Sequence, residues 1–181
     1  IQPIIVLVAV GLFAVAEALR HEYEAIVAAG MMLQIDCPDL AMGRHTQFAH
    51  LGLTDFRASM ELHVEAMNRA LVNIPAEKVR MHLCWGNYPG PHHFDVPFAD
   101  IVSRLWKAKP HAIQFEAANP RHAHEWSLFE TYKLPEGKIL CPGVIECQSN
   151  YVEHPELIAQ RIKRYADLVG RENVMAATDC G

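Results

Sequence analysis

The chain has 181 residues, a formal net charge of −5 and 51% hydrophobic residues, a composition typical of a globular domain large enough to bury a core. A charged fraction of 20% with 8% aromatic residues excludes a disordered or low-complexity chain. The acidic balance and the lack of a basic cluster argue against nucleic acid as a partner. The five cysteines are odd in number and widely spaced, so we expect reduced or metal-bound thiols in a reducing, cytoplasmic compartment.

An uncharged stretch over residues 4–16 opens the chain. It is shorter than the roughly 20 residues that a membrane-spanning helix needs, and no lysine or arginine precedes it as in a signal peptide. We therefore expect no membrane segment. The pattern predicts a buried helix that continues over residues 17–29, where Leu19, Tyr23 and Ile26 share one face. A foreign or truncated segment over residues 1–16 is the alternative origin.

Helix-period and strand-like segments alternate from residue 17 onward. We predict strands over residues 32–36, 79–85, 111–116, 138–145 and 173–178, and helices over residues 54–71, 100–108, 125–131 and 155–169. Thr54 is expected to cap the first of these helices and Gly170 to end the last. The buried face of the last helix is expected to comprise Leu157, Ile158, Ile162, Tyr165 and Val169.

This alternation predicts a parallel sheet covered by helices, as an open doubly wound sheet or a (β/α)8 barrel. No glycine-rich nucleotide motif opens a helix, which disfavours the nucleotide-binding form of the first. Four chemistry-bearing residues follow different strands at their C-terminal ends, where barrel enzymes carry their chemistry: Asp36, Cys84, Glu116 and Cys180. Five strands cannot close a barrel of eight. The predicted fold class is therefore α/β in one domain over residues 1–181, with the strand-end residues favouring a barrel over an open sheet.

A metal site is suggested by the residue types at these strand ends. His82 and Cys84 are two residues apart on a strand, so their side chains point to the same side. Glu116 ends an apolar strand and would be costly to bury without an ionic partner or a metal. Cys180 follows the last predicted strand. Two thiolates with an imidazole favour zinc over magnesium or calcium.

Several motifs then resemble one known family. They are HLCWGNYPGPHH at residues 82–93, FEAANPR at 115–121, CPGVIE at 141–146 and ATDCG at 177–181. In this order and spacing they resemble the cobalamin-independent methionine synthase family, more closely its stand-alone members built around the catalytic barrel. The segment LQIDCPDLAMGRH at residues 33–45 resembles the same family's I-D-x-P-x-L region. The resemblance runs from about residue 17 to residue 181.

The resemblance implies a zinc-dependent S-methyltransferase acting on a homocysteine-like thiol, with roles for specific residues. The family's zinc ligands fall on His82, Cys84, Glu116 and Cys180, with Glu116 expected to leave the metal when the thiol binds. The family's substrate-contacting aspartate falls on Asp36, so Asp36 and Glu116 are the expected catalytic residues. By this mapping the chain is an incomplete TIM barrel that supplies strands four to eight, which indicates a fragment.

Two positions depart from the family pattern. Met42 stands where methionine synthases have a glutamate that helps to hold folate, and Gln148 stands where they have the proposed proton-donating histidine. The methyl donor therefore stays open. A folate, a methylcobalamin protein, or an activated alkyl substrate as in the related epoxyalkane:coenzyme M transferases are the alternatives.

Further residues near the strand ends are candidates for the pocket. His92 and His93 follow a Gly-Pro turn and are expected to line it. Asn119 and Arg121 are expected to orient Glu116 or to contact a substrate carboxylate. The remaining histidines and cysteines of these motifs are expected to be solvated (His122, His124) or to serve as packing thiols (Cys37, Cys141, Cys147).

Three functional classes remain open at this point. The first is a zinc thiol alkyltransferase whose partners are a small-molecule thiol and a methyl donor. The second is a hydrolase barrel with metal-bound water, which would usually have more histidine and aspartate ligands. The third is an inactive or complementing barrel fragment, which would self-associate through exposed sheet edges.

Overall fold

A computed structural model describes residues 2–180, with side chains from residue 9 onward. Gly181, the last residue of the ATDCG motif, lies outside the described residues, as do the side chains of residues 4–8. The helices are α1 (Gln2–Ala28), α2 (Leu53–Ala70), α3 (Phe98–Leu105) and α4 (Pro155–Val169). The strands are β1 (Leu33–Cys37), β2 (Val79–Leu83), β3 (Ala112–Phe115), β4 (Ile139–Ile145) and β5 (Ala177–Thr178). Short 3-10 helices occupy Pro38–Leu40, Met42–Arg44, Ala76–Lys78, Glu125–Glu130 and Arg171–Asn173.

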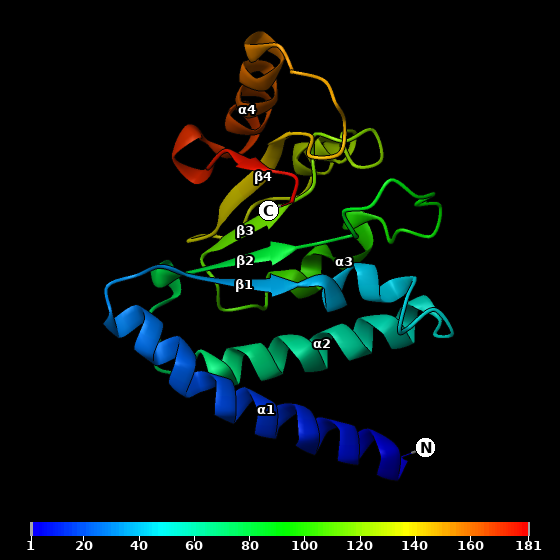
Figure 1. Ribbon diagram of the computed structural model, residues 1–181, viewed down its shortest axis with the longest axis vertical. Helices are drawn as coiled ribbons and strands as arrows, with labels where there is room; N and C mark the ends of the chain where they lie inside the picture. The colour runs from blue at the N-terminus through cyan, green and yellow to red at the C-terminus, as the bar shows by residue number, and fades with distance from the viewer. Residues whose placement is uncertain (1, 181) are drawn as a thin grey trace.

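The five strands form one parallel sheet in the order β1-β2-β3-β4-β5. Each strand pairs with the next one along the chain, and the order never reverses as it does in a doubly wound sheet. Figure 1 shows the strands side by side with their carboxyl ends at one edge, and α2 and α3 on one side of β1 and β2. The sequence prediction of an incomplete (β/α)8 barrel is confirmed.

The two faces of the sheet differ in polarity because side chains alternate along each strand. Met81, Ile113 and Leu140 are fully buried on the helix-covered face. On the opposite face, the register aligns Asp36 with His82, and His82 with Gln114. Polar side chains of three strands therefore lie in one row across the sheet.

An aromatic core lies between the sheet and its covering helices. Phe98 of α3, Phe115 of β3 and Phe129 of the 3-10 helix contact one another, with ring centroids 4.9–6.5 Å apart. Tyr165 of α4 packs against Phe115 and Phe129 at 5.9 and 6.0 Å. Each of these rings buries a large apolar area, so this cluster fixes α3 and α4 against the strands that carry the site.

Helix α1 forms as predicted but is not buried as expected. Val10 and Val15 are 60% and 55% exposed, and among its described side chains only Ala16 is fully buried. The reason is its position, since α1 lies on the outer side of α2 (Figure 1). Tyr23 and Ile26 do pack on an apolar cluster that includes Leu33 and Val79. No helix among the described residues is long and apolar enough to cross a membrane.

Three local predictions need correction. Thr54 does not cap α2, because the helix starts one residue earlier and Gly52 is its N-cap. The predicted buried face of α4 is reduced to Tyr165, with Leu157 exposed. The last strand is confined to Ala177–Thr178, because Asn173 ends a 3-10 helix and Val174 makes only an isolated bridge to Leu140. Gly170 ends α4 as expected, with a φ of +89° that favours glycine.

Candidate metal centre

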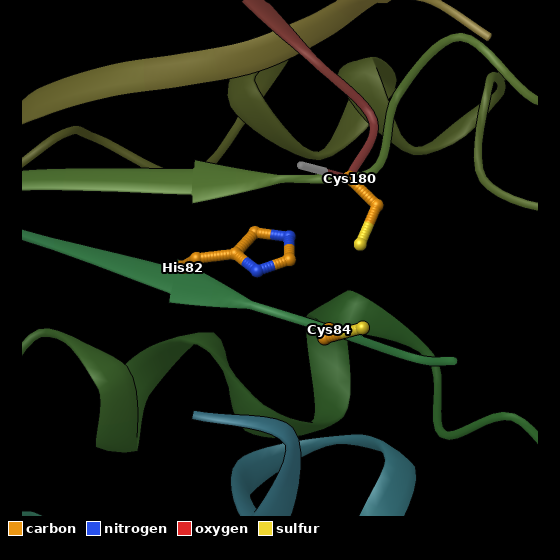
Figure 2. A group of neighbouring side chains, drawn as sticks. All are labelled: His82, Cys84 and Cys180. Atoms are coloured by element: carbon orange, nitrogen blue, oxygen red, sulfur yellow. The ribbon is translucent and has the colours of Figure 1, made fainter. Parts of the chain in front are cut away.

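Three of the four predicted metal ligands meet at the carboxyl edge of the sheet. His82, Cys84 and Cys180 each offer a ligand atom, and these atoms all lie within 4.8 Å of one another. Figure 2 shows the His82 ring and the Cys180 sulfur directed into the same space above Cys84. His82 lies on β2, Cys84 directly follows it, and Cys180 comes two residues after β5. Strands distant in sequence therefore bring the group together.

The His82 ring is oriented by Asp36 on the neighbouring strand. Its Nδ1 lies 2.8 Å from Asp36 Oδ1, and the ring itself is buried. Its Nε2 lies 3.3 Å from the main-chain oxygen of Asp179, the residue before Cys180. A carboxylate that holds one ring nitrogen leaves the other as the metal ligand. With Nδ1 engaged by Asp36, Nε2 is the ring nitrogen of His82 that could serve as a metal ligand.

The Cys84 thiol lies in a buried turn that begins where β2 ends. Burial is the largest influence on its pKa; the Gly86 N–H, 3.3 Å from its sulfur, has an opposing effect, and the net result raises the pKa to about 12. Gly86 itself has a φ of +105°, which a residue with a side chain rarely adopts. At neutral pH the thiol stays protonated unless a cation balances the thiolate.

Glu116 is buried beside this group without being part of it. Its Oε1 accepts a hydrogen bond of 3.0 Å from the Trp85 N–H. Its Oε2 accepts hydrogen bonds from Asn119 Nδ2 at 2.9 Å and Arg121 Nη2 at 3.3 Å. Both carboxylate oxygens therefore have protein partners in this structure.

Asp179 is a site residue that the sequence reasoning missed. Its Oδ1 accepts hydrogen bonds from the main-chain N–H groups of Ala117 and Ala118, each at 2.8 Å. Its Oδ2 accepts from the Asn119 main chain at 2.8 Å and side chain at 2.9 Å. The carboxylate therefore fixes the turn after Glu116 relative to Cys180. An acid directly before a candidate ligand was the only sequence signal for this role.

The donor set fits a zinc ion. Zinc holds cysteine sulfur at about 2.3 Å and histidine nitrogen at about 2.0 Å, so tetrahedral ligands lie within about 4 Å of one another. The 4.8 Å limit for His82, Cys84 and Cys180 is close to this spacing. Two thiols and an imidazole are soft ligands that select zinc-like metals. The protonated Cys84 thiol is also the kind of group that such a cation deprotonates.

Asn119 and Arg121 both contact Glu116. This is the first of the two roles expected from the sequence, orienting Glu116 or contacting a substrate carboxylate. Asn119 is buried, and its Oδ1 accepts hydrogen bonds from the main-chain N–H groups of Arg121 and His122. Its polar atoms are thus engaged within the protein. Arg121 has a partly exposed side chain, and its Nε is buried without a hydrogen-bond partner. Of the two side chains, that of Arg121 is the one exposed enough to reach a substrate.

The expected position of His92 and His93 at the pocket stays a prediction, and their contacts lie within the loop after β2. His92 uses Nδ1 for Asp95 at 3.0 Å and Nε2 for the Tyr88 main-chain oxygen at 3.1 Å, so it holds its own loop together. His93 is exposed.

His122 was expected to be solvated, and this is wrong. It is buried between Asp95 at 3.0 Å and Glu125 at 2.8 Å, and its ring packs against Trp85 at a tilt of 36°, with centroids 4.4 Å apart. Burial alone would lower its pKa, but the hydrogen bonds to the two carboxylates outweigh this and raise it to about 9. Two acids distant in sequence create this environment. His124 is exposed, as expected.

The two residues that depart from the family pattern both contact the turn after Cys84. The Met42 N–H donates to the Cys84 main-chain oxygen at 2.9 Å. Gln148 Nε2 donates to Asn87 Oδ1 at 2.6 Å. They therefore border the site from the loops after β1 and β4.

Comparison with known proteins identifies the family of this chain. A family model described as "Cobalamin-independent synthase, Catalytic domain" matches residues 9–181. A methionine synthase from Saccharolobus islandicus is 27% identical over 93% of this chain and 43% of its own length. A 2-hydroxypropyl-CoM lyase from Xanthobacter autotrophicus is 24% identical over 65% of this chain and 38% of its own length. The chain thus spans less than half the length of these relatives.

A solved structure shares the fold. The B12-independent methionine synthase from Shewanella sp. W3-18-1, in complex with selenomethionine, superposes with a TM-score of 0.70 and 18% identity. The superposition covers 93% of this chain and 47% of that one. The family match extends over nearly the whole chain, and the chain belongs to the cobalamin-independent methionine synthase catalytic-domain family.

Proposed function

We propose that this chain carries the metal centre of a zinc-dependent methyltransferase that activates a homocysteine-like thiol. The observation that carries the proposal is the convergence of His82, Cys84 and Cys180 within 4.8 Å at the carboxyl edge of the sheet. Family membership supports methyl transfer as the reaction class. Zinc, when bound, would deprotonate the substrate thiol at neutral pH and keep its sulfur nucleophilic.

The protein residues have separate roles in this proposal. Cys84 and Cys180 supply two thiolates, which keep the site electron-rich. Asp36 holds His82 in position through the 2.8 Å hydrogen bond. The Asp36 side chain is 65% exposed, so it also has room to meet the ammonium group of an amino acid substrate, the role that the family resemblance implies. We assign Arg121 to a substrate carboxylate, because its side chain is partly exposed beside Glu116.

Glu116 serves in this proposal as the fourth ligand that departs when the thiol arrives. A four-coordinate site has no vacant position, so one ligand must leave or the shell must expand. Glu116 is the hard oxygen ligand of the set. Its carboxylate can accept hydrogen bonds from Trp85, Asn119 and Arg121 after it leaves the metal. Its departure therefore leaves no unsatisfied buried charge, which would otherwise be costly.

A second candidate is alkyl transfer to a different thiol. Met42 and Gln148 replace the residues that the family uses for folate and proton donation, and a coenzyme M lyase is among the relatives. The same zinc thiolate chemistry would then act on an activated alkyl substrate. The two candidates share the metal centre and differ only in the thiol and the donor.

An assay with a simple chemical methyl donor tests thiol activation, the step that both candidates share. The zinc-loaded chain is mixed with methyl iodide and either homocysteine or 2-mercaptoethanesulfonate, and the methylated thiol is quantified by mass spectrometry. We expect faster methylation of one thiol than in buffer, and loss of that acceleration in Cys84→Ser. Preference for homocysteine supports the methionine synthase reading, and preference for the sulfonate supports the second candidate. No acceleration of either thiol contradicts both.

A further inference from the structure

Cys147 lies against the main chain of the candidate ligand Cys180. Its sulfur is 3.1 Å from the Cys180 carbonyl oxygen and 3.3 Å from the Cys180 nitrogen. The sheet register explains the contact. Ile145 pairs with Thr178, and each cysteine comes two residues later in its own chain segment, so the two residues continue as neighbours past the ends of β4 and β5.

Cys147 is also the cysteine most open to solvent. Cys37, Cys84 and Cys141 are buried, Cys180 is partly buried and Cys147 is exposed. Oxidants react with thiols according to their access and thiolate character. Cys84 and Cys141 are both buried, which limits the access of a soluble oxidant to their sulfur atoms. A soluble oxidant therefore meets Cys147 first.

The geometry allows the two cysteines to be linked. A disulfide needs Cα atoms about 4.4–6.8 Å apart, and a sulfur 3.3 Å from the partner's own main-chain nitrogen is consistent with that range. The Cys180 sulfur faces Cys84 and His82 in this structure (Figure 2), so rotation about its Cα–Cβ bond is the movement that linkage requires.

We propose that Cys147 is an oxidation site that forms a disulfide with Cys180 and thereby withdraws Cys180 from the metal centre. A hydroperoxide first oxidises the Cys147 thiol to a sulfenic acid and is itself reduced, with release of water or an alcohol. The Cys180 sulfur then attacks the Cys147 sulfur. The S–S bond forms, the S–O bond breaks, and the oxygen leaves as water with the thiol proton. A small-molecule thiol reverses the linkage by exchange.

The consequence for the metal rests on the proposed function. With Cys180 in a disulfide, the group retains His82 and Cys84 but only one thiolate, and affinity for a soft metal falls. The substrate of the proposed reaction is itself a thiol, so it can reduce the disulfide. Oxidation would thus release the metal from the centre. Abundant thiol substrate would reduce the disulfide and restore Cys180 as a ligand.

Peptide mapping tests the linkage directly. The chain, with and without zinc, is treated with hydrogen peroxide near stoichiometry, alkylated and digested without reductant. Trypsin leaves Cys141 and Cys147 together on residues 139–161, and cleavage after Glu146 separates them. Released zinc is followed with a chromophoric chelator. Cys147→Ser is the test variant, and Cys141→Ser, which removes a buried thiol from β4, is the matched control.

The expected result is a Cys147–Cys180 peptide in the wild type and in Cys141→Ser, with zinc release at least about ten-fold slower in Cys147→Ser. Zinc release at an equal rate in Cys147→Ser, or a Cys84–Cys180 peptide as the main product, overturns the proposal. A chain that forms the Cys147–Cys180 disulfide but never binds zinc upholds the oxidation site and refutes the metal centre instead.

Discussion

Asp36 and His82 occupy the same register position on neighbouring strands and are joined by a 2.8 Å contact between Asp36 Oδ1 and His82 Nδ1. The contact fixes which imidazole nitrogen faces Cys84 and Cys180. A carboxylate behind a metal-binding histidine typically contributes about 10–100-fold to metal affinity. Orientation of His82 is therefore a property of the β1–β2 pairing as much as of His82 itself.

Removing this carboxylate should weaken the metal site without unfolding the protein. We expect Asp36→Ala to lower zinc affinity about 10–100-fold, since the exposed side chain contributes little to the core. Competition with a chelator of known affinity measures the change. Asp39→Ala is the matched control, because Asp39 pairs with His63 outside the site. Equal losses in the two variants would contradict the assigned role of Asp36.

Gly143 should be required for the position of Asp179 and hence of Cys180. A Cβ at residue 143 would lie 2.0 Å from Asp179 Oδ1 and 2.6 Å from Asp179 Cα, so the backbone must shift. We expect Gly143→Ala to destabilise the fold by about 1–3 kcal/mol and to weaken zinc binding. Urea unfolding and zinc titration check both.

Gly11→Ala provides the comparison for that variant. Gly11 lies in α1, and a Cβ there meets nothing within 4 Å. Alanine in a helix interior should stabilise by about 0.5–1 kcal/mol with zinc affinity unchanged. A Gly143→Ala protein with normal stability and normal zinc affinity would show that the close contact with Asp179 is not needed.

The buried His122 should make stability fall with rising pH. Its folded pKa of about 9 lies above the ordinary value of 6.5, so protonation favours the folded state. The contribution is fully present below pH 6.5 and is lost as the pH rises to about 9. By linkage it amounts to roughly 3 kcal/mol.

The measurement compares the free energy of unfolding in urea at pH 6.5 and pH 9. We expect the wild type to lose more stability across this interval than His122→Gln does. Burial alone would raise the pKa of Asp95, but hydrogen bonds to His122 and His92 outweigh this effect and lower the pKa, so this carboxylate does not change its charge in the interval. The same pH dependence in both proteins would assign it to another group.

Glu116 is expected to behave differently from the cysteines. Cys84→Ser and Cys180→Ser each remove a soft ligand and should reduce zinc to well below one ion per chain. Glu116→Gln should retain zinc more strongly than either, because the two thiolates and His82 remain. Metal analysis after dialysis decides this. Greater zinc loss in Glu116→Gln than in Cys84→Ser would contradict a departing carboxylate.

The sequence predicted the features that depend on the periodicity of apolar residues and on the order of strands and helices. Alternation along β2 placed His82 and Cys84 on one side, and the strand–helix order predicted the parallel sheet. Prediction failed for the burial of side chains that depends on distant parts of the folded chain. The apolar residues of α1 predicted burial, but α2 covers only one of its faces. His122 carried no local sign of burial, because Asp95 and Glu125 enclose it only in the folded chain.

Glu116 and Asp179 illustrate the same limit within the site. A strand-end acid indicates a functional position, yet its partners cannot be derived from spacing. The donors to Asp179 are main-chain N–H groups of residues 117–119, which every residue type except proline provides. The residues could therefore be predicted, whereas their hydrogen bonds required the structure.

X-ray absorption at the zinc edge, recorded before and after addition of homocysteine, tests the central claim most directly. We predict one zinc per chain with two sulfur ligands from Cys84 and Cys180, nitrogen from His82 and oxygen from Glu116. Addition of the thiol should raise the sulfur count to three and remove the oxygen. A zinc-loaded chain with fewer than two sulfur ligands, or with ligation unchanged by the thiol, would contradict it.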